Sequence, residues 1–303
     1  MGSMPRPSGS ATVRAARLET PWVRRQIGHS SHMKPDHSRG SVRSPAVAGS
    51  FYPSDPEELR GSVDDMLAAG AVPETEVEVR FLIVPHAGYV YSGPVAATAY
   101  RLLQGVARSP GMVVIGPSHF VAFPGMATPG VEGLATPLGI VSADTELTAT
   151  AEAHPVVAPN QAAHSREHSV EVQLPFLQVV CDQLTVLSLL TGIVEPETVA
   201  AVLGDLIENE GGVAVISSDL SHYLDYDSAR VRDTRTARAI VARRPHDLAR
   251  GDACGLVGVQ AALLVARERG WECSLLDLRS SGDTAGDRNS VVGYGSFVIG
   301  PAR

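Results

Sequence analysis

The 303-residue chain has few cysteines and no long apolar run. Three cysteines, Cys181, Cys254 and Cys273, are too few and too scattered for a disulfide framework, and an odd number is typical of a reducing compartment. No apolar stretch approaches the roughly 18 residues that a membrane span needs. The first 30 residues also lack the apolar core of a secretory signal. We therefore expect a cytoplasmic protein without a membrane segment.

Several common catalytic and nucleotide-binding motifs are missing as well. The chain contains no C-x-x-C pair, no G-x-x-x-x-G-K-[ST] phosphate loop and no G-x-S-x-G nucleophile elbow. These absences remove the simplest routes to thiol exchange, P-loop nucleotide hydrolysis and esterase chemistry. The function must therefore be inferred from other polar residues.

Charge is distributed unevenly along the chain. The net charge is −8, yet residues 1–50 hold eight basic and two acidic side chains, so the remainder carries −14. Such an acidic body lacks the clustered cations that a nucleic-acid backbone requires, and we expect no nucleic-acid partner. Residues 1–43 are polar and show no hydrophobic periodicity, which predicts a disordered basic extension ahead of a folded domain over residues 44–303.

Apolar runs alternate with helical patterns throughout the predicted domain. The predicted strands are Phe81–Val84, Met112–Ile115, Leu184–Leu190, Val213–Ile216, Cys273–Leu278 and Val291–Ile299. The predicted helices are one that starts at Ser54-Asp55-Pro56, then Val95–Leu103, Val170–Val180, Glu195–Ile207, Arg230–Ala242 and Val257–Arg267. This alternation favours an α/β fold, a single three-layer α/β/α domain with a mostly parallel or mixed central sheet.

Ionisable side chains follow three of the predicted strands. FLIVP leads to His86, MVVIGPS leads to His119, and VAVISSDLS leads to Asp219 and His222. Ligands of open α/β sheets bind outside the carboxyl ends of the strands, so we expect at least two of these histidines to share a site. Imidazole binds zinc, copper, iron and nickel, and the histidines alone therefore do not select a metal.

Cys254 is a further candidate because it lies just before the predicted helix Val257–Arg267. A helix N-terminus lowers the pKa of a thiol, which favours the thiolate for metal binding or redox work. The alternative is that Cys254 is simply a small buried residue. Cys181 and Cys273 lie inside apolar runs, and for them burial is the better interpretation.

The segment HSREH, from His164 to His168, has the H-x-x-E-H spacing of one class of zinc peptidases. That chemistry needs both histidines on one helical face. Here the segment precedes Ser169, a typical helix cap, which places the pair in a loop ahead of the next helix. A zinc-dependent hydrolase is therefore the less favoured alternative, although His168 and Glu171 are expected to face the cleft.

Five motifs occur in an order that resembles the Memo family, namely PHAGYVYSG, GPSH, EHSVEVQLPFL, SSDLSHY and ACG. The family is named after a mediator of ErbB-driven cell motility, and its bacterial members are often labelled AmmeMemoRadiSam system protein B. The resemblance covers residues of about 44–301. It implies a fold similar to the class III extradiol dioxygenases, non-haem iron enzymes that cleave aromatic rings.

The same resemblance implies a metal pocket formed by His86, His119 and Cys254, with Asp219 and His222 beside it. It also implies iron or copper binding linked to redox activity. The bacterial label suggests two partners, a radical S-adenosylmethionine protein and a member of the family named for the Alport-syndrome chromosomal region. Many members carry a second histidine after GPSH, where this chain has a phenylalanine.

A thiolate in place of the carboxylate of non-haem iron oxygenases makes a softer ligand set, which shifts the preference towards copper(I) or zinc. His222 is then the candidate for proton transfer, because its ordinary pKa lies near neutrality. Asp219 would orient His222 or contact a metal-bound water, and His168 is a third candidate catalytic residue. The favoured hypothesis is a redox protein, oxygenase- or oxidase-like, that uses iron or copper on an unknown small molecule. The alternative is a non-catalytic adaptor that binds a metal or a peptide.

Overall fold

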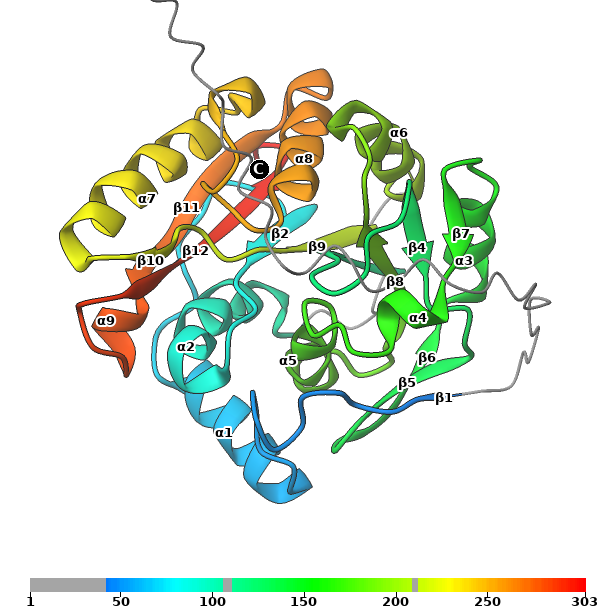
Figure 1. Cartoon of the computed structure of the whole chain (residues 1–303), viewed down its shortest axis with the longest axis horizontal. Coiled ribbons are helices and arrows are strands. Elements are labelled where there is room, and N and C mark those ends of the chain that lie inside the picture. Colours follow the sequence, from blue (N-terminus) through cyan, green and yellow to red (C-terminus); the bar gives the residue numbers. More distant parts are fainter. Residues whose placement is uncertain (1–41, 106–110, 209–211) are drawn as a thin grey trace, which may run out of the picture. The chain divides into compact units, whose positions relative to one another are not determined.

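The computed structural model describes residues 42–105, 111–208 and 212–303 (Figure 1). The predicted disordered extension covers residues 1–43, and its first 41 residues lie outside the described ranges, where disorder stays a prediction. Its last two residues, Val42 and Arg43, form strand β1, which pairs with β5. The fold therefore includes two residues that the sequence assigned to the extension.

A mixed sheet runs through the described residues in the order β1-β5-β6-β8-β3-β9-β2-β12-β10. The strands are β1 (Val42–Arg43), β2 (Phe81–Val84), β3 (Met112–Pro117), β4 (Met126–Thr128), β5 (Gly133–Thr136), β6 (Gly139–Ala143), β7 (Val157–Pro159), β8 (Thr185–Thr191), β9 (Val213–Ser217), β10 (His222–Leu224), β11 (Glu272–Ser280) and β12 (Val291–Gly300). The neighbours β8, β3, β9 and β2 run parallel, whereas β12 is antiparallel to β2 and β11 is antiparallel to β12. β4 pairs with β8 and β7 beside this path.

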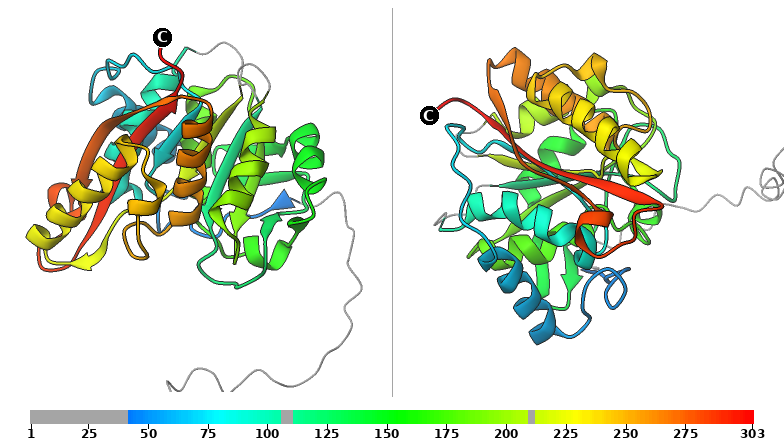
Figure 2. Two further views of the ribbon diagram at one scale, coloured as in Figure 1. Left: turned by 90° about the horizontal axis from the view of Figure 1, so that it is seen from above. Right: turned by 90° about the vertical axis from the view of Figure 1, so that its left-hand side faces the viewer.

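Helices cover both faces of the sheet (Figures 1 and 2). The α-helices are α1 (Pro56–Ala68), α2 (Tyr89–Tyr100), α3 (Thr145–Glu152), α4 (Gln161–His164), α5 (Leu174–Val180), α6 (Pro196–Leu206), α7 (Tyr226–Val241), α8 (Leu256–Glu268) and α9 (Ser281–Thr284). The short 3₁₀ helices are η1 (Arg101–Leu103), η2 (Glu171–Gln173) and η3 (Pro245–Asp247). Within the described ranges, no helix combines the length and the apolar content that crossing a bilayer would require.

Two apolar cores explain why the central strands read as continuous apolar runs. In β2, Phe81 and Ile83 belong to the core beneath α6, α7 and α8, while Leu82 and Val84 belong to the core beneath α1, α2 and α5. Successive side chains of a strand point to opposite faces, so a strand covered on both sides must be apolar at every position. The three-layer α/β/α architecture with a mixed sheet is thus confirmed.

The start of α1 follows the expected capping pattern. The Asp55 side chain accepts hydrogen bonds from the backbone N–H groups of Glu57 and Glu58, and Pro56 occupies the first turn. The predicted helix Val170–Val180 is instead divided into η2 and α5. The expected cap, Ser169, uses its hydroxyl to donate to the Pro117 carbonyl at 2.9 Å, because that loop crosses the end of β3.

Candidate metal centre

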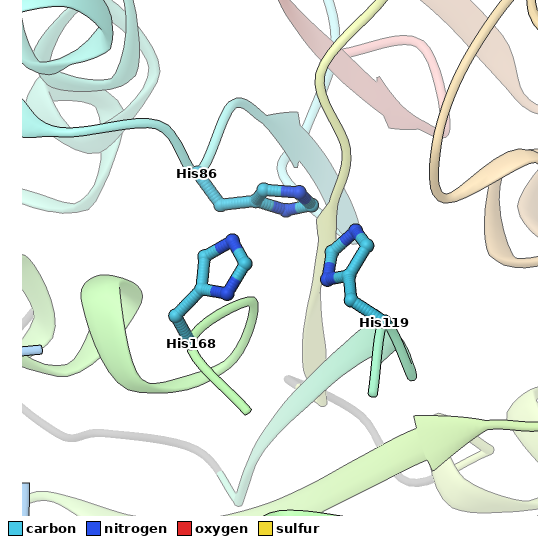
Figure 3. A group of neighbouring side chains, drawn as sticks. All are labelled: His86, His119 and His168. Atoms are coloured by element: carbon cyan, nitrogen blue, oxygen red, sulfur yellow. The ribbon is translucent and has the colours of Figure 1, made fainter. Parts of the chain in front are cut away.

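Three histidines from separate segments converge at the carboxyl edge of the parallel strands (Figure 3). His86 follows β2, His119 follows β3, and His168 lies in the loop between α4 and η2. One ring nitrogen of each histidine lies within 4.8 Å of the others. The rings of His119 and His168 stack with centroids 4.8 Å apart, and the His86 ring is edge-on to both. The structure thus brings His86 and His119 together, as expected, and places His168 with them.

Buried hydrogen bonds determine which nitrogen of His86 carries its proton. The Ser217 hydroxyl donates its single proton to the Ser169 carbonyl at 2.5 Å and accepts from the Gln173 amide at 2.8 Å. Tyr100 donates to the Gln173 oxygen at 2.8 Å, which sets the orientation of that amide. The His86 Nδ1, 2.8 Å from the Ser217 oxygen, must therefore be the donor. Its Nε2 is therefore the unprotonated nitrogen, the form of imidazole that binds a metal.

Glu167 determines the tautomer of His119 in the same way. Its carboxylate accepts from His119 Nδ1 at 2.9 Å and from three backbone N–H groups, those of His119 at 2.6 Å and of His168 and Ser169 at 2.9 Å each. Burial alone would raise the pKa of Glu167, but the hydrogen bonds from His119 and Ser169 outweigh it and lower the pKa to about 2. The ionised carboxylate holds a proton on His119 Nδ1, so Nε2 is the nitrogen of this ring that could bind a metal.

Two imidazoles of this group, those of His86 and His168, have lowered pKa values and so favour the neutral form. Burial lowers the pKa of His86 well below its ordinary value, and the neighbouring His119 and His168 lower it further. Burial is also the main reason why the pKa of His168 is lowered. A metal replaces no proton when it binds a neutral imidazole, so these side chains are ready to act as ligands near neutral pH.

Cys254 lies against His86, with its Sγ 3.1 Å from His86 Nε2. The backbone N–H of Asp219 donates to the same sulfur at 3.2 Å. Burial, followed by the charge of Asp219, raises the pKa of the Cys254 thiol. The predicted lowering of this pKa by the start of α8 is therefore wrong for the metal-free protein, because desolvation dominates. A bound cation would reverse the effect, since a coordinating thiol is deprotonated.

Asp219 and His222 form a pair next to the histidines. Asp219 Oδ1 accepts from the backbone N–H of His86 at 2.7 Å, and its Oδ2 lies 4.0 Å from His222 Nε2. His222 Nδ1 is 2.9 Å from the Leu220 carbonyl, which can only accept, so Nδ1 carries a proton. Burial raises the pKa of Asp219. The His222 side chain is 33 % exposed and so connects a buried carboxyl group with solvent.

The H-x-x-E-H segment does not form a zinc site of the peptidase kind. His164 ends α4, and its Nε2 is 2.9 Å from the Ala127 carbonyl. Burial lowers the pKa of His164 to about 4. His168 lies beyond the helix and belongs to the histidine group, which His164 does not join among the described residues. The expectation that Glu171 faces the cleft is also wrong, because its carboxylate is bonded to Arg43 and Tyr52.

Sequence reasoning missed the residues that orient the histidines. Ser217 and Glu167 were visible only as parts of the SSD and H-x-x-E-H motifs, and Gln173 as a polar residue in a helical pattern. All three are buried, with at most 2 % of their surface exposed. The only sequence signal was a polar residue in an otherwise apolar environment, which indicates a hydrogen-bonded role without naming the partner.

The architecture and the site define a class, a three-layer α/β protein with imidazoles gathered at the ends of its parallel strands. The chain belongs to the Memo-like protein family, whose model matches residues 43–298. It is similar to a MEMO1 family protein of Aquifex aeolicus, with 34 % identity over 272 residues that cover 85 % of this chain and 99 % of the relative.

Two archaeal relatives have the same extent. A MEMO1 family protein of Methanopyrus kandleri is 35 % identical over 280 residues, covering 85 % of this chain and 98 % of the relative. One of Ignicoccus hospitalis is 36 % identical over 276 residues, covering 84 % and 96 %. The family resemblance of the five motifs is therefore confirmed.

Proposed function

We propose that this chain is a metal-dependent redox protein in which His86, His119 and Cys254 hold iron or copper. The observation that carries the proposal is the pair of imidazoles, His86 and His119, whose Nδ1 protons are committed to Ser217 and Glu167. Their Nε2 lone pairs are left for a ligand, and the Cys254 sulfur lies 3.1 Å from one of them. Such outer hydrogen bonds orient metal-binding histidines and make them more basic.

The chemistry of these donors fits the proposed metals. Imidazole suits iron, copper and zinc, whereas thiolate favours copper(I), zinc and iron–sulfur chemistry over hard cations. When bound at a site with open positions, iron or copper would supply one-electron chemistry or activate dioxygen. His168 is close enough to the same point to be a further ligand or to contact the substrate. Its neutral state suits either role.

His222 and Asp219 would handle protons in this proposal. Asp219 is buried, which raises its pKa, and His222 Nε2 lies 4.0 Å from its Oδ2 at the border with solvent. A proton can therefore move between the two groups through a single water or a small shift of the ring. The substrate would be a small molecule, and the two partner proteins suggested by the family label belong to this proposal as well.

The test is to purify the protein without oxygen and to measure bound metals per chain by mass spectrometry. We expect near-stoichiometric iron or copper in the wild type and its loss in His86→Ala and Cys254→Ala. Cys273→Ala is the matched control, because Cys273 is also a buried thiol with a raised pKa but lies in β11. It should keep the metal.

The same measurement on His168→Ala distinguishes a ligand role of His168 from a catalytic one. Loss of metal would make His168 a ligand, whereas full metal content with lost turnover would support the catalytic role. Metal retained by both His86→Ala and Cys254→Ala would refute the proposed ligand set. A wild type that binds no metal even after reconstitution would favour the adaptor.

A further inference from the structure

The segment Val42–Pro53, here called the N-terminal clip, is bound to the loop that carries His168. Within the clip, the Arg43 guanidinium donates to the carbonyls of His164 at 2.7 Å and Glu167 at 2.6 Å, and to the Glu171 carboxylate at 2.7 Å. The Arg43 guanidinium therefore contacts the chain at two positions before His168 and at one position after it. Arg43 and Glu171 are buried, with side chains 8 % and 0 % exposed.

Glu171, which follows His168, binds further groups of the clip. Its carboxylate accepts from the backbone N–H groups of Ala46 at 2.7 Å and Val47 at 2.9 Å, and from the Tyr52 hydroxyl at 2.6 Å. With Arg43, four donors satisfy this buried anion. A buried ion pair is weak evidence for stability, because desolvation offsets most of the attraction. A pair whose hydrogen bonds are all satisfied does fix the position of the clip relative to the chain around His168.

The clip also reaches the segment that follows His86. The Phe51 ring packs on the His168 ring with centroids 4.8 Å apart. The Phe51 carbonyl accepts from the backbone N–H of Tyr89 at 2.7 Å, three residues after His86. One short segment thus touches His168 directly, His119 through Glu167, and the chain beyond His86.

The three histidines differ in how the sheet supports them. His86 and His119 directly follow strands β2 and β3, whose ladders fix the backbone just before them. The loop from Ser165 to Val170 has no strand of its own. Its position relative to the sheet depends on side-chain contacts, and Arg43 supplies one to the Glu167 carbonyl in the loop and one to the His164 carbonyl just before it.

We propose that Arg43 and Glu171 are positioning residues of the metal centre, through which the N-terminal clip fixes Glu167 and His168. The metal part of this inference rests on the proposed function, whereas the orientation of the imidazoles does not. Residue 43, which looks like the end of a dispensable extension in the sequence, is then required for the site. Neither Arg43 nor Glu171 would touch the metal or the substrate.

The test compares Arg43→Met, Arg43→Lys and Glu171→Gln in the full-length chain, with Arg279→Met as the matched control. Arg279 also pairs with a carboxylate, Asp277 at 2.8 Å, but does so in β11. Cobalt(II) titration, followed by absorption, gives the metal affinity. We expect about tenfold weaker binding in Arg43→Met and Glu171→Gln, since outer partners of ligands typically contribute tenfold or more. Arg43→Lys should lie between them and the wild type, and Arg279→Met should bind normally.

A second readout is independent of metal and of global stability. Nitrogen NMR of the metal-free proteins reports the tautomer and environment of each imidazole. We expect the His119 and His168 signals to shift in Arg43→Met and Glu171→Gln, while the His222 signals stay in place. Folded variants with unchanged imidazole signals and unchanged cobalt affinity would overturn the inference.

If Arg43→Met fails to fold, Arg43→Lys decides, because it keeps a cation beside Glu171 and leaves no unpaired buried anion. A wild type that does not bind cobalt would count against the proposed function alone. In that case the imidazole signals still determine whether the clip positions the histidines.

Discussion

Glu167→Gln should change the pH dependence of stability in a way that follows from the His119 contact. The Glu167 carboxylate accepts four hydrogen bonds, and a carboxamide can accept only on its oxygen. The substitution removes the charge and turns one acceptor into a donor that faces another donor. That mismatch destabilises the variant at every pH, so only the change with pH isolates the ionised carboxylate.

The magnitude follows from the pKa. Lowering the pKa of Glu167 from 4.5 to about 2 favours the ionised, folded state by about 3 kcal/mol. Because the folded pKa is the lower one, this stability is present above pH 4.5 and is lost as the pH falls towards 2. At pH 3 about 1 to 1.5 kcal/mol of it should remain, so about 2 kcal/mol disappears between pH 5.5 and pH 3.

Urea unfolding followed by circular dichroism at pH 5.5 and pH 3 tests this expectation. Both proteins are kept metal-free with a chelator, so that metal binding adds no pH dependence of its own. The advantage of the wild type over Glu167→Gln should shrink by about 2 kcal/mol at the lower pH. Glu78→Gln is the control, since Glu78 pairs with Arg80 at the surface and should contribute under about 1 kcal/mol at either pH. An equal advantage at both pH values would refute the reasoning.

Two further substitutions, Ser217→Ala and Gly293→Ala, test the packing in and near the site, and a third, Gly204→Ala, is a control. Ser217→Ala leaves His86 Nδ1 and the Gln173 amide without their buried acceptor. The free energy of unfolding should therefore fall by about 1–3 kcal/mol, and cobalt should bind about tenfold less tightly. Unchanged values in urea unfolding and cobalt titration would contradict this. Gly293→Ala places a Cβ 1.9 Å from the Asp233 carboxylate and should cost about 1–3 kcal/mol in thermal unfolding. Gly204→Ala, in α6 with nothing within 4 Å of the added carbon, should instead stabilise the folded protein by about 0.5–1 kcal/mol. A similar effect of the two glycine substitutions on thermal unfolding would refute the steric argument.

Local patterns predicted the central elements well. The predicted strand Phe81–Val84 coincides with β2, and Val291–Ile299 is one residue shorter than β12. Such runs are recognisable because a strand covered on both faces must be apolar at each residue. The short strands β4 and β7 were missed, since three residues carry too little periodicity to be distinguished from a loop.

The helix that follows the H-x-x-E-H segment shows where local patterns fail. Hydrophobic periodicity predicted one helix over Val170–Val180, whereas the structure has η2 and then α5. The Glu171 side chain is drawn towards Arg43, and Ser169 towards Pro117. Tertiary hydrogen bonds outweighed the small difference between two helical forms of the backbone.

The sequence by itself determined the fold class and the edge at which His86, His119, Asp219 and His222 gather. Both follow from rules that act along the chain, namely apolar alternation and the convergence of parallel strands at their carboxyl ends. Only the tertiary structure decided the tautomers of the histidines and the attachment of the clip. Those depend on pairs such as His119 with Glu167, 48 positions apart, and Arg43 with Glu171, 128 positions apart. No local pattern encodes such a pair, because each partner alone reads as an ordinary charged residue until folding buries both together.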